Sequence, residues 1–198
     1  GRVKRLHHRG FVEYVEAGEA VVLSPEMKKR VPMRFDPSLI ESPEAEPPDA
    51  QFVYKNWMFH GELFRGIKSI ERIGPQGIAG VVTGREPRLC LKTPQTDTWL
   101  MDPILFDCAM QLGAVWARFY SDITCLPTGF KRLNLIRPCP KGEAFVHVFL
   151  PTAVYNGEVV CDLAIYDKDR ELSILVEGLT GVGSKSFNRF ATAGKAIK

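Results

Sequence analysis

An acidic side chain and an amide side chain four residues apart, Asp107 and Gln111, are the pair in this sequence best suited to acid–base chemistry. Residues four positions apart lie on one face of a helix, so the two side chains would be neighbours. A carboxyl group shielded by apolar residues can hold a proton near neutral pH, and an adjacent amide can fix which carboxyl oxygen faces a substrate. The alternative interpretation is a solvated stripe on an amphipathic helix, because aspartate is ordinarily exposed.

The segment that must position this pair runs from Trp99 to Tyr120, the one long stretch with helical periodicity. Asp102 suits an N-cap, and Pro103 suits the first helical position, where its missing N–H would be unpaired in any case. Apolar residues at helical spacing form one stripe, consisting of Leu105, Cys108, Ala109, Leu112 and Trp116. Because further apolar residues lie on its other sides, we expect a helix near 102–120 wrapped by other structure.

Composition divides the chain into four segments. Residues 1–35 form a basic N-terminal segment with two strand-like runs between 10 and 23, a predicted hairpin that could be the remnant of a preceding domain. Residues 36–51 hold four prolines and five acidic residues, which disfavour helix and strand and predict a surface linker. Residues 52–184 would form the main domain, and the polar stretch 185–198 a flexible tail.

The main domain contains strand-like runs separated by turn signals. Two runs precede the helix and four follow it, at 67–73, 77–83, 130–136, 144–150, 159–166 and 172–182. Residues 84–98 are polar and interrupted by prolines, so they are predicted to be a loop, and Gly178 within the last run predicts a bulge or close contact. The pattern favours an α+β fold in which a curved antiparallel sheet wraps one long helix.

The totals exclude several classes of function. The net charge of +3 gives no case for nucleic acid, and no apolar run approaches the roughly 20 residues of a membrane span. No secretory leader opens the sequence, so we expect a cytoplasmic protein. The five cysteines form no C-x-x-C pair and the four histidines no ligand spacing, so neither a metal site nor a disulfide scaffold is predicted.

Four stretches, in the family's order, resemble the dehydratase domain of modular polyketide synthases and polyunsaturated fatty-acid synthases. Residues 59–67 are similar to the H-G-P-x-F-Q-G segment that opens the family's second hot-dog half, and residues 102–111 to its P-x-L-x-D-x-x-x-Q helix. Residues 126–133 are similar to its L-P-x-x-x-x-x-L strand, and residues 167–179 to its closing strand with a terminal E-G-L.

This resemblance implies a double hot-dog fold, two halves that each wrap one helix in one sheet. It implies dehydration of a β-hydroxyacyl chain, carried on the phosphopantetheine of an acyl carrier protein, to the α,β-enoyl thioester without a metal or redox cofactor. Asp107 matches the family's catalytic aspartate, which serves the leaving hydroxyl, and Gln111 matches the residue that orients it. Tyr54, His60 and Pro103 are the expected substrate-binding residues, although His60 also suits a structural role at a turn.

The chain lacks the motif that carries the family's catalytic base. The family's catalytic histidine lies in the first half, in H-x-x-x-G-x-x-x-x-P, and no histidine here has glycine four residues later. The chain therefore resembles mainly the second half of a dehydratase. The expected partners are a histidine-bearing hot-dog half, the other domains of a synthase and an acyl carrier protein.

Two alternatives stay open at the level of sequence. Without the base, the chain could be a non-catalytic hot-dog domain that binds an acyl chain or holds a synthase together. A hot-dog thioesterase is the third interpretation, because such enzymes can use a helix carboxylate to activate water.

Overall fold

The structure, a computed structural model, describes residues 11–13, 25–41, 46–93, 99–150 and 157–193. Its strands are β1 (Phe11–Glu13), β2 (Ile67–Gly74), β3 (Gly77–Thr83), β4 (Thr124–Gly129), β5 (Arg132–Leu135), β6 (Glu143–Phe149), β7 (Glu158–Tyr166) and β8 (Leu172–Ser184). Its α-helices are α1 (Pro25–Arg30), α2 (Ala50–Asn56), α3 (Pro87–Cys90), α4 (Pro103–Ser121) and α5 (Phe190–Ala193), and its 3-10 helices are η1 (Pro37–Leu39), η2 (Glu62–Phe64) and η3 (Lys185–Arg189).

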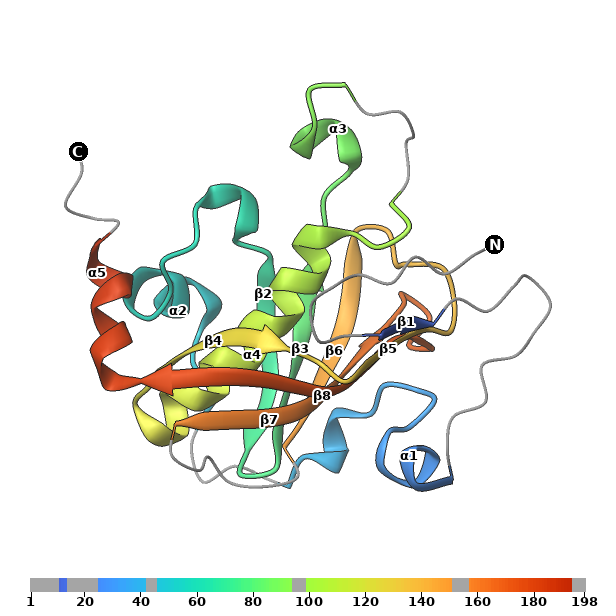
Figure 1. The fold of residues 1–198 in the computed structure, drawn as a ribbon, viewed down its shortest axis with the longest axis horizontal. Coiled ribbons are helices and arrows are strands. Elements are labelled where there is room, and N and C mark those ends of the chain that lie inside the picture. Colours follow the sequence, from blue (N-terminus) through green and yellow to red (C-terminus); the bar gives the residue numbers. More distant parts are fainter. Residues whose placement is uncertain (1–10, 14–24, 42–45, 94–98, 151–156, 194–198) are drawn as a thin grey trace.

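One eight-stranded sheet curves around the long helix α4 (Figure 1). The strand order is β1-β5-β8-β7-β6-β3-β2, and β4 pairs with β8 beside this path. Among the described residues every strand pair is antiparallel except β1 with β5, which is parallel. The predicted α+β hot-dog fold, with one helix wrapped by a curved antiparallel sheet, is confirmed.

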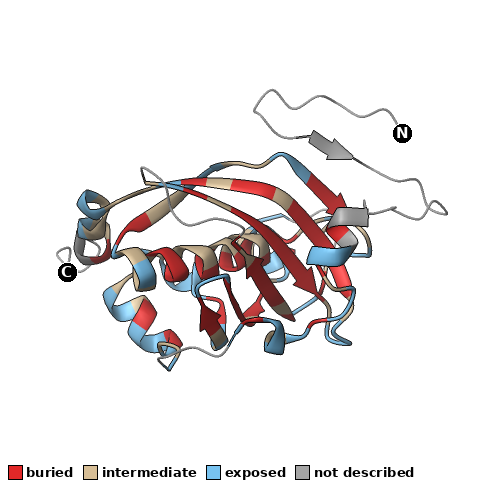
Figure 2. Cartoon of the chain, turned by 90° about the horizontal axis from the view of Figure 1, so that it is seen from below, coloured by how far each residue is buried: buried red, intermediate tan, exposed pale blue. Residues whose placement is uncertain are grey.

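Local sequence explains where α4 begins and ends. The Asp102 carboxylate accepts hydrogen bonds from the amides of Ile104 and Leu105, and Pro103 occupies the first turn. Asp122 ends the helix in the left-handed conformation with φ 52°. The residues of the predicted apolar stripe are buried against the sheet. Figure 2 shows buried segments on the long helix and on the strands that surround it.

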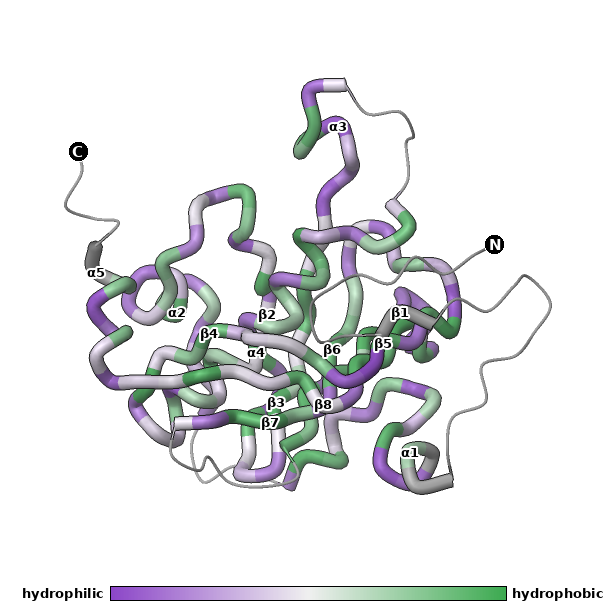
Figure 3. The backbone as a smooth tube through the Cα atoms, viewed as in Figure 1, coloured by the Kyte–Doolittle hydropathy of each residue, from purple (hydrophilic) through white to green (hydrophobic). Residues whose placement is uncertain are grey.

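A second apolar layer covers the opposite face of the sheet. Met27, Val31, Phe35 and Ile40 pack there against strand residues that include Tyr166. In strands such as β7, hydrophobic residues therefore come in a nearly continuous run instead of alternating with polar ones. Hydrophilic residues are concentrated in the connections between elements (Figure 3). Both faces of the central sheet are covered, which is the physical reason for these continuous buried runs.

The prediction that residues 36–51 lack helix and strand is wrong at both ends of this segment. Asp36 caps η1 by accepting a hydrogen bond from the Ser38 amide, and Ile40 is 1% exposed. Asp49 caps α2 in the same way. The acidic residues thus act as helix caps, and Pro37 suits a first turn, so the composition that disfavours long elements permits these short ones. Residues 42–45 lie outside the described residues.

The chain termini also differ from expectation. Strand β1 pairs in parallel with β5, and the rest of the predicted hairpin lies outside the described residues. The predicted flexible tail begins instead with η3 and α5. The Asn188 side chain accepts hydrogen bonds from the amide and hydroxyl of Thr124 and donates to the carbonyl of Asp122, which fixes η3 to the end of α4.

Two local features of the strands complete the fold. Periodicity does not predict strand β4, because Pro127 lies within it; among the described strands it pairs with β8. Gly178 forms the predicted bulge, with φ +60° and its amide donating to Asp162 Oδ1 at 2.8 Å. The described part of the predicted loop 84–98 contains the one-turn helix α3.

No helix in the described ranges is long and apolar enough to cross a membrane.

Candidate active site

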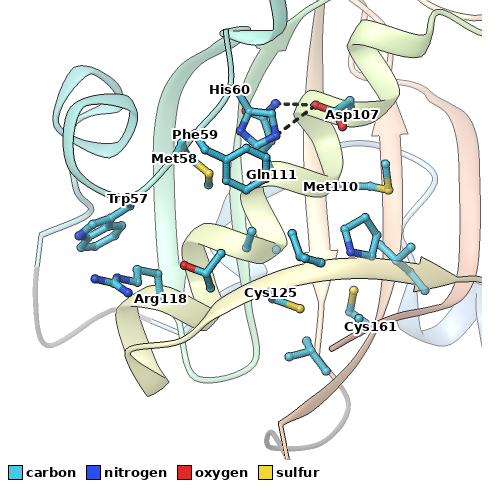
Figure 4. A pocket seen from close by; sticks show the side chains of 18 of the residues that line it. Trp57, Met58, Phe59, His60, Asp107, Met110, Gln111, Arg118, Cys125 and Cys161 are labelled. Atoms are coloured by element: carbon cyan, nitrogen blue, oxygen red, sulfur yellow. Dashed lines mark hydrogen bonds and ion pairs between the residues drawn. The ribbon is translucent and has the colours of Figure 1, made fainter. Parts of the chain in front are cut away.

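A cavity lies along one side of α4, between this helix, strand β4 and residues 57–60 (Figure 4). It is partly open to solvent, and the space inside it that a water-sized sphere can occupy is about 70 Å³. Its walls are mainly apolar and include Trp57, Met58, Phe59, Met110, Leu126 and Val159. A cavity of this kind, with a few polar groups at defined positions, is the usual form of a small-molecule site.

Asp107, Gln111 and His60 meet at one end of this cavity, and Figure 4 shows their side chains turned toward one another. Gln111 Nε2 donates a hydrogen bond to Asp107 Oδ2 at 2.7 Å, and His60 Nε2 lies 3.7 Å from the same oxygen. The Asp107 side chain is 29% exposed. Within the described residues both contacts fall on Oδ2, so Oδ1 is the oxygen available to a substrate.

Gln111 is buried and all of its amide atoms are used. Its Nε2 donates to the carbonyl of Phe64 at 2.9 Å as well as to Asp107, and its Oε1 accepts from the Tyr54 hydroxyl at 2.7 Å. The Tyr54 oxygen in turn accepts from the Ile67 amide at 2.9 Å. The predicted pairing of Asp107 with an orienting amide is therefore present, supported by residues from α2 and β2.

A close approach between β2 and α4 makes this network possible. A Cβ at Gly66 would lie 2.6 Å from the Cys108 sulfur and 2.5 Å from the Thr83 carbonyl oxygen, closer than side-chain atoms can come. Only glycine fits here, and it brings the carbonyl of Phe64 within reach of Gln111.

The turn that carries His60 is held from two directions. The Arg65 Nε donates to the His60 carbonyl at 2.9 Å, and the ring of Phe59 stacks on the imidazole at 4.6 Å. Phe59 also meets the edge of Phe190 in α5. His60, one of the expected substrate-binding residues, lies in the wall of the cavity.

Two of the expected substrate-binding residues lie outside the lining of this cavity. Tyr54 does not line this cavity, because its hydroxyl is turned toward Gln111 and the Ile67 amide. Pro103 is exposed at the first turn of α4 and likewise does not line it. Both residues support Asp107 from outside, Pro103 through the start of the helix and Tyr54 through the amide.

Burial shifts the pKa values of two side chains near Asp107, His60 and Cys108. Burial lowers the pKa of His60, against the opposing effect of the Asp107 carboxylate. His60 Nδ1 is buried without a hydrogen-bond partner in the described part of the chain, so a second N–H on an imidazolium would be unsatisfied. A neutral ring with its hydrogen on Nε2, facing Asp107, fits both observations. Burial raises the pKa of the Cys108 thiol to about 12, which disfavours the reactive thiolate form.

Sequence reasoning missed much of the cavity. Arg118 lines it eleven residues after Asp107, about 16 Å further along α4, and helical spacing could have identified it. Cys125 on β4 and Cys161 on β7 also line it, and only the strand pairing brings them together. Within the described ranges no group of His, Cys, Asp and Glu is arranged to hold a metal ion.

The comparisons with known proteins decide the family. The family model described as "Polyketide synthase dehydratase N-terminal domain" matches residues 33–182. The chain belongs to this family. The model bears the name of the N-terminal domain, so the assignment of this dehydratase-family chain to the second half is not confirmed. Among curated proteins no match was found.

Solved dehydratase structures share the fold of this dehydratase-family chain. The dehydratase domain of RzxB from Pseudomonas fluorescens is 18% identical with a TM-score of 0.55, covering 68% of this chain and 48% of its own. The dehydratase domain from the CurF module of curacin polyketide synthase is 16% identical with a TM-score of 0.54, covering 85% and 54%. The chain thus spans about half the length of these structures.

Proposed function

We propose that this chain supplies the acid side of a dehydratase site, which converts a β-hydroxyacyl thioester to the α,β-enoyl thioester. The observation that carries the proposal is the position of Asp107, which lines an apolar cavity beside α4 and whose Oδ1 has no partner among the described residues. A β-hydroxyl is a poor leaving group, so a positioned general acid must protonate it. Membership of the dehydratase family supports the same reaction.

In the proposed reaction a base removes the proton from the α-carbon, and its bonding electrons form the new double bond. The C–O bond at the β-carbon breaks, and the departing oxygen takes the proton of Asp107 and leaves as water. The acyl chain would lie along α4 toward Arg118, against the apolar walls. Burial of that apolar chain would contribute most of the binding free energy.

The base in this proposal comes from a histidine-bearing hot-dog half. His60 is the only histidine among the described cavity-lining residues, but its Nε2 faces Asp107 and its pKa is lowered by burial. It is therefore assigned as a neutral neighbour of the acid. Two variants of the CurK dehydratase, one replacing a histidine by phenylalanine and one an aspartate by asparagine, are described as inactive, which is consistent with a two-residue requirement.

The proposal also names partners, and family membership supports the other domains of a synthase among them. The thioester is carried on the phosphopantetheine of an acyl carrier protein, and the chain works within a multidomain synthase. Arg132 lies at the exposed start of β5, where positive charge can steer an acidic carrier.

The test is formation of enoyl thioester, followed by ultraviolet absorbance, from a β-hydroxyacyl pantetheine. The chain together with its histidine-bearing half should be active, and the chain alone should be slow or inactive. His60→Asn, which keeps a side-chain N–H donor, should retain activity within about tenfold. A loss as large as that of Asp107→Asn would instead assign the base to His60.

Two other functions remain as outcomes of the same experiment. Release of free thiol from a saturated acyl pantetheine would indicate a thioesterase. Binding of acyl pantetheine without either reaction, with the histidine-bearing half present, would indicate a non-catalytic acyl-binding or scaffolding domain.

A further inference from the structure

We infer that a one-way chain of hydrogen bonds, from the Ile67 amide through Tyr54 and Gln111, fixes the carboxyl oxygen on which Asp107 carries its proton. Tyr54 is in this inference a positioning residue, and its catalytic meaning rests on the proposed dehydration. The contacts that carry it span three separate elements, α2, β2 and α4.

The direction of the chain follows from its two ends. The Ile67 amide can only donate, so the Tyr54 oxygen accepts from it, and the single hydroxyl hydrogen goes to Gln111 at 2.7 Å. The Gln111 atom that accepts must be the carbonyl oxygen. At the far end the Phe64 carbonyl can only accept, so it requires the amide nitrogen of Gln111 beside it. Both ends demand the same orientation of the amide.

Burial makes the reverse orientation costly. Gln111 is 3% exposed, and turning its amide over would set its oxygen against the Phe64 carbonyl and its nitrogen against the Tyr54 hydroxyl hydrogen. Buried polar groups left without partners are strongly disfavoured. The amide nitrogen is therefore held 2.7 Å from Asp107 Oδ2.

The consequence falls on the carboxyl group. An oxygen that receives an N–H cannot also carry a proton on that side, because two hydrogens would meet. The neutral His60, with its hydrogen on Nε2, adds a second N–H near the same oxygen. A protonated Asp107 therefore carries its hydrogen on Oδ1, the oxygen that receives neither N–H. Tyr54 and Gln111 thus keep the acid aimed at the substrate.

The first test measures the Gln111 side-chain amide by NMR in the full chain. Its two hydrogens should exchange slowly with solvent, because both are bonded inside the protein. Tyr54→Phe keeps the ring and removes only the hydroxyl, and should raise that exchange rate at least about tenfold. Gln111→Met identifies the resonances by removing them. Unchanged exchange in Tyr54→Phe would overturn the inference.

Tyr166→Phe is the matched control. Tyr166 is also a buried tyrosine, and its hydroxyl donates to the Pro32 carbonyl at 3.1 Å on the opposite face of the sheet. Its loss should destabilise the fold by a comparable mechanism and leave the Gln111 amide unchanged. Equal acceleration in both variants would attribute the effect to general loosening and overturn the inference.

The second test is a double-mutant cycle on dehydration, with the histidine-bearing half present. Tyr54→Phe should lower kcat about tenfold with KM within twofold, and should cost almost nothing in the Gln111→Met background. An equal cost in both backgrounds would show that Tyr54 acts independently of Gln111, against the inference. Absence of dehydration in the unmutated protein would contradict the proposed function, whereas the exchange measurement would still decide the direction of the hydrogen bonds.

Discussion

Two aspartates lie five residues apart at the N-terminal end of α4, and the hydrogen bonds to their carboxylates differ. Asp102 is 4% exposed and accepts hydrogen bonds from the amides of Ile104, Leu105 and Arg85, so both of its oxygens are occupied by backbone donors. The Asp107 side chain is 29% exposed, and within the described part of the chain its polar contacts fall on Oδ2 alone. A fully bonded carboxylate stabilises the fold, whereas a half-bonded one keeps an oxygen for a substrate, as the proposed function requires.

The comparison predicts its largest effect for Asp107→Asn. This substitution keeps the shape and removes the acidic proton, so dehydration should fall by about 10² to 10⁴-fold. The thermal unfolding midpoint should stay close to that of the unmutated protein, because no backbone donor loses its partner. Enoyl absorbance and calorimetry on the same preparation measure both quantities. Full activity in this variant would end the assignment of Asp107 as the acid.

Asp102→Ala should show the converse. Loss of the N-cap and of the acceptor for the Arg85 amide should lower the free energy of unfolding by about 2–4 kcal/mol. Denaturant unfolding measures this loss. Asp102→Asn, which keeps a capping oxygen, should cost less and serves as the control. If Asp102→Ala unfolds at the same denaturant concentration as the unmutated protein, the contrast between the two aspartates fails.

Two histidines extend the contrast to pH. His147 is 1% exposed within β6, and burial lowers its pKa to about 4. The unfolded chain binds this proton near pH 6.5, whereas the folded chain resists it until about pH 4. The contribution of neutral His147 to the free energy of unfolding is therefore fully present above pH 6.5. It is lost as the pH falls toward 4, and the loss is about 3 kcal/mol at most.

This pH dependence is measured by denaturant unfolding between pH 7 and pH 4. His147→Phe removes the titrating group, so the difference between the two proteins should shrink or reverse as the pH falls. A constant difference across the range would contradict the assignment of a depressed pKa. His60, at the cavity, should contribute a smaller loss of the same sign, because burial lowers its pKa while Asp107 opposes the change.

The smallest effect is expected for Gln111→Ala. This substitution leaves Asp107 its proton but removes the donor on Oδ2, so kcat should fall about tenfold and less than in Asp107→Asn. Steady-state kinetics with the same thioester separates the two. A loss equal to that of Asp107→Asn would mean that Gln111 takes part in the chemistry directly.

The parts of this molecule that local pattern predicts are the parts that local interactions determine. The start of α4 follows from Asp102 and Pro103, and its inward face from apolar spacing, so the proximity of Asp107 and Gln111 was predictable. The hydrogen bond from Tyr54 to Gln111 joins residues 57 positions apart, and no periodic pattern in the sequence predicts it. The sequence therefore indicated that Gln111 orients Asp107, but it did not indicate that Tyr54 orients Gln111.

The covering of the outer sheet face escaped prediction for a different reason. Its apolar residues are dispersed among prolines and charges, and Ile40 and Phe35 gain partners only when the sheet has formed. Strand β4 similarly depends on β8, because Pro127 removes one of its donors and only the neighbouring strand reveals the pairing. In both cases the information lies in contacts between distant segments.

The outer layer also determines where this domain can be excised from a longer polypeptide. A fragment that begins at Phe52, as composition alone suggests, would remove Phe35 and Ile40 and expose the apolar sheet surface around Tyr166. Such surfaces promote aggregation during expression. A soluble recombinant domain should therefore start before α1 at Pro25, so that the helix and the segment after it travel with the sheet they cover.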